Sequence, residues 1–343
     1  MYPRSVIFIR RDNIGDLVCT TPAFRAVRTH LPQCRIAVLV NSYNADVIAD
    51  NPDVDDIYVY GKWKHSAGRT RLGVWMENLD VIREIRRQRF DVSIGCGCVY
   101  SARLARYAFF TGGRTRICPT PGGRKTFFIN CPVPEPDAPI HEVEAMMRLI
   151  EPLGVTGPAP APCVRPDAVE AAKVLKMLEA AGVKDRKNQI AFHISSRRPQ
   201  NRWPIESFHA LGDLISAKHG FPIMLLWSPG KGDNPLHPGD DENAQRLCVS
   251  MKNKPIPYRT EGLKGLIAAL SAASVVVCCD GGAMHIAAAL GKPVLTVWGG
   301  TDARRWSPRG AAHVILKNGA DASSVTPLEA FSAFNRLIMG DSH

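Results

Sequence analysis

The feature that most limits the fold is a regular alternation of short apolar runs with segments of helical periodicity. In the first half, the apolar runs cover residues 5–10, 35–40, 57–60 and 91–96. Helical periodicity covers residues 15–31 and 74–90. Short apolar runs bounded by turn residues predict buried strands, and their alternation with amphipathic helices predicts βαβ units in a parallel sheet. The predicted fold class is therefore α/β.

The alternation is interrupted at residues 151–167, where proline, glycine and alanine dominate. A segment of this composition is typical of a linker. Beyond it, strand-like runs cover residues 189–195, 221–227, 275–279 and 294–299, and helical segments cover residues 168–182, 205–220, 263–273 and 327–340. A chain of 343 residues is too long for one ordinary domain. We expect a domain at residues 1–157 and another at 165–326, with a ligand cleft between them.

The composition is that of an ordinary globular protein. Hydrophobic residues make up 45% of the chain and charged residues 22%, which is enough for a large core. No apolar run reaches the roughly 18 residues of a membrane helix, and the first residues lack the pattern of a signal peptide, so we expect a cytoplasmic protein. The ten cysteines form no CxxC pair and are expected to be buried free thiols.

Positive charge is concentrated in one part of the chain. The net charge is +11, and the segment from Lys62 to Lys125 holds 14 Lys and Arg against 4 Asp and Glu, a net of +10. Such a segment is either a solvated basic face or a surface that meets an anionic partner such as a membrane, a nucleic acid or an acidic substrate.

An acid and two glycines connect the apolar run 275–279 to the helical segment that follows it. They are Asp280, Gly281 and Gly282, and His285 lies about one turn further on. Unpaired backbone N–H groups at a helix start bind phosphate, and glycine lets a ligand approach the backbone closely. We favour an anion site, while a tight turn with Asp280 as a helix cap explains the same residues.

Two other strand ends carry polar residues. The first run leads to Asp16 with Gly15 as the only nearby glycine, which argues against a dinucleotide fingerprint. Asp16 is either an acid favoured by the helix dipole or a general base, and its sequence position leaves both open. After the run 189–195 come Ser195, Ser196, Arg197, Arg198 and Arg202. These suit a diphosphate, or else form a solvated loop.

The triplet from Asp53 to Asp55 looks like the DxD metal motif of some nucleotide-sugar enzymes. It stands just before a short strand, and solvated turn residues are the favoured interpretation. We therefore predict no metal site.

Four motifs together resemble glycosyltransferase family 9, the bacterial heptosyltransferases that build the lipopolysaccharide core. They are IGDLVCTTPAFRAVR, RFDVSIG, RWPIESF and DGGAMHIAAALGKPVLTVWGGTDARRWSP, which follow one another along nearly the whole chain. The resemblance implies a GT-B fold, in which two Rossmann-like domains with parallel sheets face a central cleft. It also implies that the helix at residues 327–340 packs back on the first domain.

The resemblance further implies an inverting, metal-independent transfer of a sugar without a cofactor. The expected donor is ADP-heptose or a similar nucleotide-sugar, held by the second domain. The expected acceptor is a lipopolysaccharide core or a related anionic glycan, held by the first domain. Two alternatives stay open: another GT-B nucleotide-sugar enzyme such as an epimerase, and a non-catalytic basic protein that binds membrane or nucleic acid. No nucleic-acid module is recognisable in the sequence.

The matching positions assign roles to residues. Asp16 matches the catalytic base. The donor-binding positions matched by the family motifs are Ser195, Ser196, Asp280, Gly281, Gly282 and His285. The family commonly carries a lysine where this chain has Asn201, so Arg202 or Arg198 is expected to supply that charge. For the acidic donor contact, Glu242 is preferred over Asp241.

The acceptor is expected at a glycine-containing stretch between a strand and a helix. Its basic residues are Lys62, Lys64, Arg69 and Arg71. The concentrated positive charge suits a lipid-linked anionic saccharide, so we also expect peripheral contact with the inner membrane surface.

Overall fold

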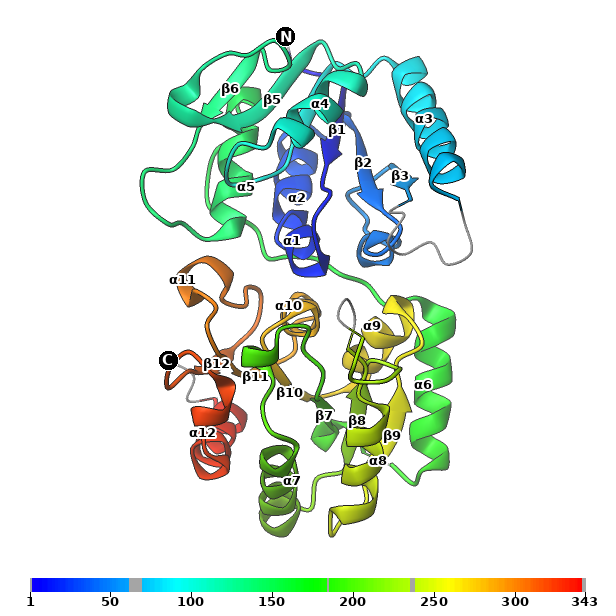
Figure 1. Ribbon diagram of the computed structural model, residues 1–343, viewed down its shortest axis with the longest axis vertical. Coiled ribbons are helices and arrows are strands. Elements are labelled where there is room, and N and C mark those ends of the chain that lie inside the picture. The colour runs from blue at the N-terminus through cyan, green and yellow to red at the C-terminus, as the bar shows by residue number, and fades with distance from the viewer. Residues whose placement is uncertain (1, 62–69, 184, 235–237, 341–343) are drawn as a thin grey trace. The chain divides into compact units, whose positions relative to one another are not determined.

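The chain divides into two compact units, Met1–Cys163 and Val164–His343. The computed structural model describes residues 2–61, 70–183, 185–234 and 238–340. The division lies inside the segment at residues 151–167 that the sequence marks as a linker. Each unit is an α/β structure built on its own sheet (Figure 1).

The first unit contains a six-stranded, fully parallel sheet. Its strands are β1 (Ser5–Ile9), β2 (Arg35–Asn41), β3 (Asp56–Tyr60), β4 (Val92–Gly95), β5 (Thr115–Thr120) and β6 (Cys131–Pro134). They lie in the order β3-β2-β1-β4-β5-β6, and β1 pairs with β2 and β4 on its two sides. This is the order of a doubly wound dinucleotide-binding sheet.

The second unit repeats this arrangement. Its strands are β7 (Ile190–His193), β8 (Ile223–Trp227), β9 (Ile256–Arg259), β10 (Val275–Cys279), β11 (Val294–Val297) and β12 (His313–Leu316). Their order, β12-β11-β10-β7-β8-β9, is the same pattern as in the first unit when the strands are counted from β7. The α/β class and the two parallel sheets expected from the sequence are confirmed.

The helices of the first unit differ from the prediction, which named only the segments 15–31 and 74–90. They are α1 (Ile14–Val18), α2 (Thr21–His30), α3 (Arg71–Gln88), α4 (Ala102–Phe110) and α5 (Glu142–Ile150). The single helix expected at residues 15–31 is two helices. Pro22 lacks an amide hydrogen and is tolerated only in the first turn, and α2 accordingly starts at Thr21 with Pro22 in that turn.

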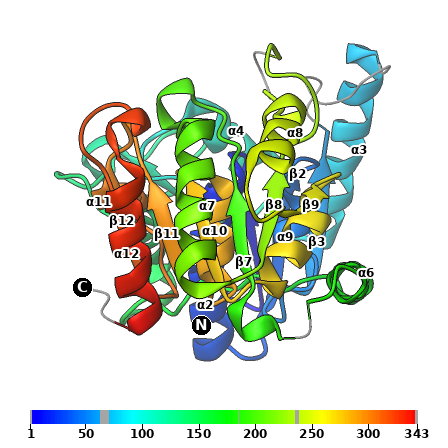
Figure 2. The ribbon, with the colours of Figure 1, turned by 90° about the horizontal axis from the view of Figure 1, so that it is seen from below.

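The helices of the second unit include the helix that was expected to return to the first domain. They are α6 (Ala168–Ala180), α7 (Ile205–His219), α8 (Asp241–Ser250), α9 (Leu263–Ala272), α10 (Gly282–Ala289), α11 (Ala303–Trp306) and α12 (Pro327–Met339). Helix α12 lies beside α7 and over β11 and β12 (Figure 2). Its apolar face, with Ala330, Phe334 and Leu337, is part of the core of the second unit, which differs from the expected packing on the first domain.

Buried apolar side chains on both faces of each sheet explain why these strands read as continuous apolar runs. In the first unit the core includes Ile7, Ile9, Leu39 and Phe90. In the second it includes Phe192, Leu225 and Val277.

The ten cysteines are free, and seven are buried. Burial raises the pKa of the Cys96 thiol to about 12, so this thiol is protonated at neutral pH, as expected for a structural cysteine.

Candidate active-site residues

The strand order places the candidate residues at one point in each unit. In a doubly wound sheet, ligands bind beyond the carboxyl ends of the strands where the order reverses. This switch point lies between β1 and β4 in the first unit and between β7 and β10 in the second. Asp16 follows β1, Ser195 and Ser196 follow β7, and Asp280 follows β10. The topology therefore explains why these residues lie at the ends of neighbouring strands.

Asp16 is held by two contacts at the start of α1. One carboxylate oxygen, Oδ1, accepts a hydrogen bond from the Arg10 guanidinium at 2.8 Å. The other, Oδ2, accepts one from the backbone N–H of Asn13 at 3.1 Å, which makes a capping box with the helix N-terminus. The side chain keeps 15% of its surface exposed. Asp16 is thus fixed in orientation and reachable from solvent.

Arg10 joins Asp16 to a second carboxylate. Its guanidinium is only 1% exposed and also donates to Glu142 on α5 at 2.7 Å. A third contact reaches the Met146 sulfur at 3.4 Å. Burial alone would lower the pKa of Arg10, but the nearby carboxylates of Asp16, Glu142 and Asp12 raise it overall. Arg10 therefore stays charged. The sequence analysis did not single out either Arg10 or Glu142.

Asp280 does not act as the helix cap. The N-cap of α10 is Gly281, and the Asp280 carboxylate accepts hydrogen bonds from the Asn201 amide at 2.7 Å and the Thr301 hydroxyl at 2.5 Å. Burial raises the pKa of Asp280, while the Thr301 hydrogen bond and the charges of Arg198 and Lys317 oppose the shift. Asp280 therefore holds together the connections that follow β7, β10 and β11.

Strand β10 ends at Cys279 and helix α10 begins at Gly282, so the first backbone N–H groups of the helix lie near the switch point. His285 is buried on this helix. Its ring meets Trp306 edge to face, with 6.2 Å between the ring centroids. The anion site expected at this helix start stays a prediction, whereas the His285 ring is packed inside the unit.

A second polar cluster forms around Asp240, which precedes α8. Its side chain is 1% exposed and accepts from both terminal nitrogens of Arg202, at 2.8 and 3.1 Å. The Ser195 hydroxyl donates to it at 2.7 Å and accepts from the Ser228 N–H at 2.9 Å. The Ser196 hydroxyl instead donates to the Asp280 carbonyl at 3.1 Å. Ser195, one of the two predicted serines, is therefore bonded to a carboxylate that was not predicted from the sequence.

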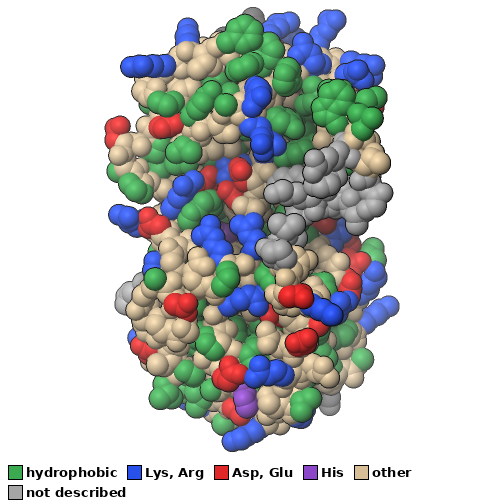
Figure 3. Space-filling model, viewed as in Figure 1, with side chains coloured by type: hydrophobic (Ala, Val, Ile, Leu, Met, Phe, Trp, Pro, Cys, Tyr) green, Lys and Arg blue, Asp and Glu red, His purple; other side chains and the backbone are tan. Residues whose placement is uncertain are grey.

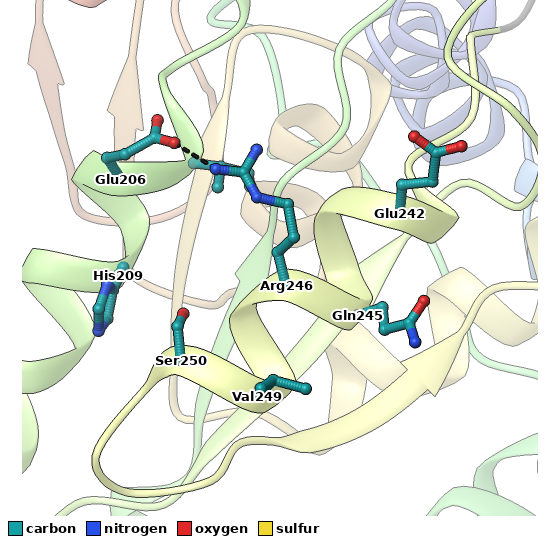
Figure 4. A pocket seen from close by; sticks show the side chains of 8 residues that line it. Glu206, His209, Glu242, Gln245, Arg246, Val249 and Ser250 are labelled. Atoms are coloured by element: carbon teal, nitrogen blue, oxygen red, sulfur yellow. Dashed lines mark hydrogen bonds and ion pairs between the residues drawn. The ribbon is translucent and has the colours of Figure 1, made fainter.

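Glu242 lies apart from this cluster. It is exposed on α8 and borders a surface pocket of about 560 Å³ with His209, Gln245 and Arg246, as Figure 4 shows. Helix α8 begins at Asp241, and the preceding residue, Asp240, is its N-cap. The Asp240 backbone N–H donates to the carbonyl of Ser228, just after β8, at 2.9 Å, while Glu242 is exposed in the first turn of the helix. Asp240 is thus the acid that contacts Ser195 and Arg202, and the role of Glu242 as the acidic donor contact stays a prediction.

Asp241, the alternative to Glu242, has a structural environment of its own. It accepts hydrogen bonds from Arg259, from the Trp227 indole and from the Gly230 N–H. These contacts, led by the one from Arg259, lower the pKa of Asp241 to about 2.

A signal for Asp240 was present in the sequence, because Gly239 and Asp240 directly precede a helical segment, a typical helix-start pattern.

The two candidate cations differ in their surroundings. Arg202 is committed to Asp240 and to the carbonyl of Ser196, whereas Arg198 is exposed and lies within electrostatic range of Asp280. Asn201, at the position of the family lysine, is buried and donates to Asp280 and Thr301. The side chain at that position is therefore part of the internal framework.

The aspartates at 53 and 55 are paired with arginines. Asp53 is buried, which corrects the expectation of a solvated turn, and accepts from Arg25 at 2.6 Å. Asp55 accepts from Arg28 at 2.6 Å. Over the described ranges, no group of three or more His, Cys, Asp or Glu is arranged to hold a metal ion.

Most of the predicted acceptor residues lie outside the part of the chain that the structure describes. Lys62, Lys64 and Arg69 lie outside the described residues, and Arg71 is the first residue of α3. On the face of the first unit shown in Figure 3, Lys and Arg side chains stand in several groups among hydrophobic ones. In the part of the chain that the structure describes, no helix is long and apolar enough to cross a membrane.

Two doubly wound units with polar side chains at each switch point are typical of nucleotide-binding α/β enzymes. The family model of glycosyltransferase family 9 (heptosyltransferase) matches residues 79–327. The chain belongs to this family and is a glycosyltransferase.

Relatives of known name support the same family. The lipopolysaccharide heptosyltransferase 3 of Escherichia coli strain K12 is 24% identical over 308 residues, which cover 86% of this chain and 82% of the relative. A glycosyl transferase family 9 structure from Veillonella parvula DSM 2008 has a TM-score of 0.85 at 19% identity, covering 98% and 97% of the two chains.

The E. coli heptosyltransferase WaaC with ADP-2-deoxy-2-fluoro heptose has a TM-score of 0.75 at 20% identity, covering 98% of this chain and all of that one. This likeness shows that the chain has the GT-B fold expected from the sequence.

Proposed function

We propose that this enzyme transfers a heptose from ADP-heptose to a lipopolysaccharide core or a related anionic glycan, with inversion at the anomeric carbon. The names of its relatives support the sugar and the acceptor class, and the similar structures with ADP and an ADP-heptose analogue support the donor. The observation that carries the proposal is the Asp16 carboxylate, partly exposed and oriented by Arg10 at the switch point of the first unit.

In this mechanism Asp16 removes the proton from the acceptor hydroxyl as its oxygen attacks the anomeric carbon. The bond from that carbon to the diphosphate oxygen breaks, and the nucleoside diphosphate leaves from the opposite face. Arg10 is a positioning residue, because it reaches the substrate only through Asp16. A single displacement of this kind inverts the anomeric centre.

The second unit holds the donor in this proposal. The backbone N–H groups at the start of α10 and the exposed Arg198 meet the charge that grows on the diphosphate. Asp240, with Arg202 and Ser195, supports the loop that carries Ser196. These groups supply the electrostatic stabilisation that a divalent metal supplies in other transferases, so we propose a metal-independent reaction.

The test is an assay with radiolabelled ADP-heptose and a truncated core acceptor. The proposal predicts acceptor-dependent formation of a labelled glycan and release of ADP, with activity retained after dialysis against EDTA. Release of an altered free sugar without an acceptor would instead indicate an epimerase, and absence of any conversion would indicate a binding protein. Activity lost to EDTA and restored by Mg²⁺ or Mn²⁺ would contradict the metal-free mechanism.

The acceptor is proposed to bind at the basic stretch that includes Lys62, Lys64, Arg69 and Arg71. Exposed attractions are screened beyond about 10 Å at 0.1 M salt, so the acceptor KM rises with salt more than the donor KM does. Neutralising these four residues reproduces the rise at low salt. A quadruple variant that keeps its acceptor KM but loses donor affinity would contradict this assignment.

A further inference from the structure

Four phenylalanines form a cluster on the first unit, at the end of α4 and in the connection between β5 and β6. We call Phe109, Phe110, Phe127 and Phe128 the phenylalanine cluster. The Phe109 ring centroid lies 5.8 Å from Phe110, 5.4 Å from Phe127 and 5.5 Å from Phe128. The Phe127 and Phe128 centroids are 5.3 Å apart. The four rings therefore form one continuous apolar feature from two separate segments.

The cluster has a half-buried base and an exposed tip. Phe128 packs against the core of the unit, and Phe109 is half-buried. By contrast, Phe127 is 77% exposed and Phe110 is 47% exposed. Single exposed apolar residues are common, but exposed aromatic rings held together on a rigid base mark an interaction surface.

Positive charge surrounds these rings. Residues 92–134 contain no Asp or Glu, and their Lys and Arg are Arg103, Arg106, Arg114, Arg116, Arg124 and Lys125. The Arg116 guanidinium lies 5.5 Å from the Phe109 ring centroid and donates to the Phe128 carbonyl at 2.8 Å. Arg86 on α3 donates to the Phe110 carbonyl at 3.2 Å. Arg116 and Arg86 are thus fixed next to the cluster.

The combination of exposed aromatic rings and nearby cations favours one class of partner over others. A second copy docked on the same face would bring two sets of like charges together, which is unfavourable. Single-stranded nucleic acid uses separate aromatic faces as stacking platforms, whereas three contacts in the cluster are edge to face, at 70°, 76° and 84°. An anionic bilayer accepts apolar rings below the headgroups while Lys and Arg remain at the charged surface.

We propose that the phenylalanine cluster docks the first unit on an anionic lipid bilayer, with Phe110 and Phe127 inserted among the headgroups. The surrounding cations, among them Arg124 and Lys125, hold the lipid phosphates. This surface includes no proposed acceptor or catalytic residue, and it goes beyond the proposed function because lipid binding requires neither donor nor acceptor.

Vesicle co-sedimentation of the full chain, without substrates, tests the proposal. The wild type is expected to bind vesicles of phosphatidylcholine with 30% phosphatidylglycerol and to bind pure phosphatidylcholine vesicles much more weakly. The double variant Phe110→Ser, Phe127→Ser should weaken binding to the anionic vesicles by about tenfold or more, because it removes two insertable rings. The double variant Arg124→Glu, Lys125→Glu should weaken it to a similar degree.

Matched controls come from exposed positions of the second unit. Val169→Ser with Val249→Ser removes two exposed apolar side chains, and Lys176→Glu with Lys187→Glu reverses two exposed charges. Both control variants should bind like the wild type, and all variants should keep their unfolding midpoints. Equal binding by wild type and cluster variants would overturn the proposal. So would a cluster-dependent dimer in sedimentation velocity, or cluster-dependent oligonucleotide binding without vesicle binding.

Discussion

In the first unit the carboxylate at the switch point lies against a buried guanidinium, whereas in the second unit it lies among neutral donors. Asp16 pairs with Arg10, which also pairs with Glu142. Asp280 accepts from the Asn201 amide and the Thr301 hydroxyl. The strand order around the two carboxylates is the same. Identical topology therefore brings polar groups together, and the neighbouring side chains give each carboxylate a different environment.

This difference suggests that the two carboxylates, Asp16 and Asp280, have different roles. A carboxylate held by a buried guanidinium suits a base that must keep its orientation. A carboxylate whose pKa is raised by burial and held by neutral groups suits an internal support for the loops around α10.

Replacing Arg10 should have the largest effect on stability. Arg10→Met leaves Glu142 buried without its guanidinium, and breaking a buried ion pair in this way costs about 3–5 kcal/mol of unfolding free energy. The matched change in the second unit, Asn201→Ala, removes hydrogen bonds from a neutral donor and should cost about 1–3 kcal/mol. Urea denaturation of both variants gives the comparison. Equal losses would show that the two carboxylates are held alike.

Replacing Arg202 should have an intermediate effect. Arg202→Ala removes the two hydrogen bonds to the Asp240 carboxylate, and the loss of a charged hydrogen bond costs about 1.5–3 kcal/mol. Arg198→Ala, at an exposed position, should change the unfolding free energy by no more than about 0.5 kcal/mol and should weaken donor binding. If Arg198→Ala lowered the unfolding free energy while Arg202→Ala kept the wild-type value, the roles that we assign to the two arginines would be reversed.

The smallest effect concerns the pH dependence of Asp280. Its folded-state pKa is raised by burial, so the folded state takes up a proton at a higher pH than the unfolded chain does. The wild type should therefore gain stability relative to Asp280→Asn as pH falls from 7 through the raised pKa, and the gain should level off below the ordinary value of about 4. Urea titrations of the two proteins at each pH measure this difference. If the wild type instead loses stability relative to Asp280→Asn as the pH falls, the folded-state pKa of Asp280 is lowered and not raised.

The sequence predicted the parts of this molecule that depend on local pattern. Buried parallel strands such as β1 and β10 show as apolar runs because both faces of the sheet are covered. Asp16, Ser195 and Asp280 could be found because each follows such a run. The short strands β5 and β6, which contain Pro119 and two further prolines, carry a weaker pattern and were missed.

Contacts between distant segments were not accessible from the sequence. Glu142 lies 132 positions from Arg10, and Thr301 lies 21 from Asp280, so only the folded chain reveals them. Asp240 was missed because the choice between neighbouring acids depends on where α8 begins, and helix boundaries are uncertain by a few residues. The packing of α12 on the second unit likewise depends on which core its apolar face completes.

The most direct test of the account is the rate of heptose transfer by Asp16→Asn under single-turnover conditions, with ADP-heptose affinity measured on the same preparation. The account predicts that the variant keeps its fold and donor affinity, because the donor is proposed to lie in the second unit. Its transfer rate should fall by about 10²–10⁴-fold, the usual cost of losing a general base. Near-wild-type transfer by a folded variant would contradict the account and leave Asp16 as a helix-terminal acid.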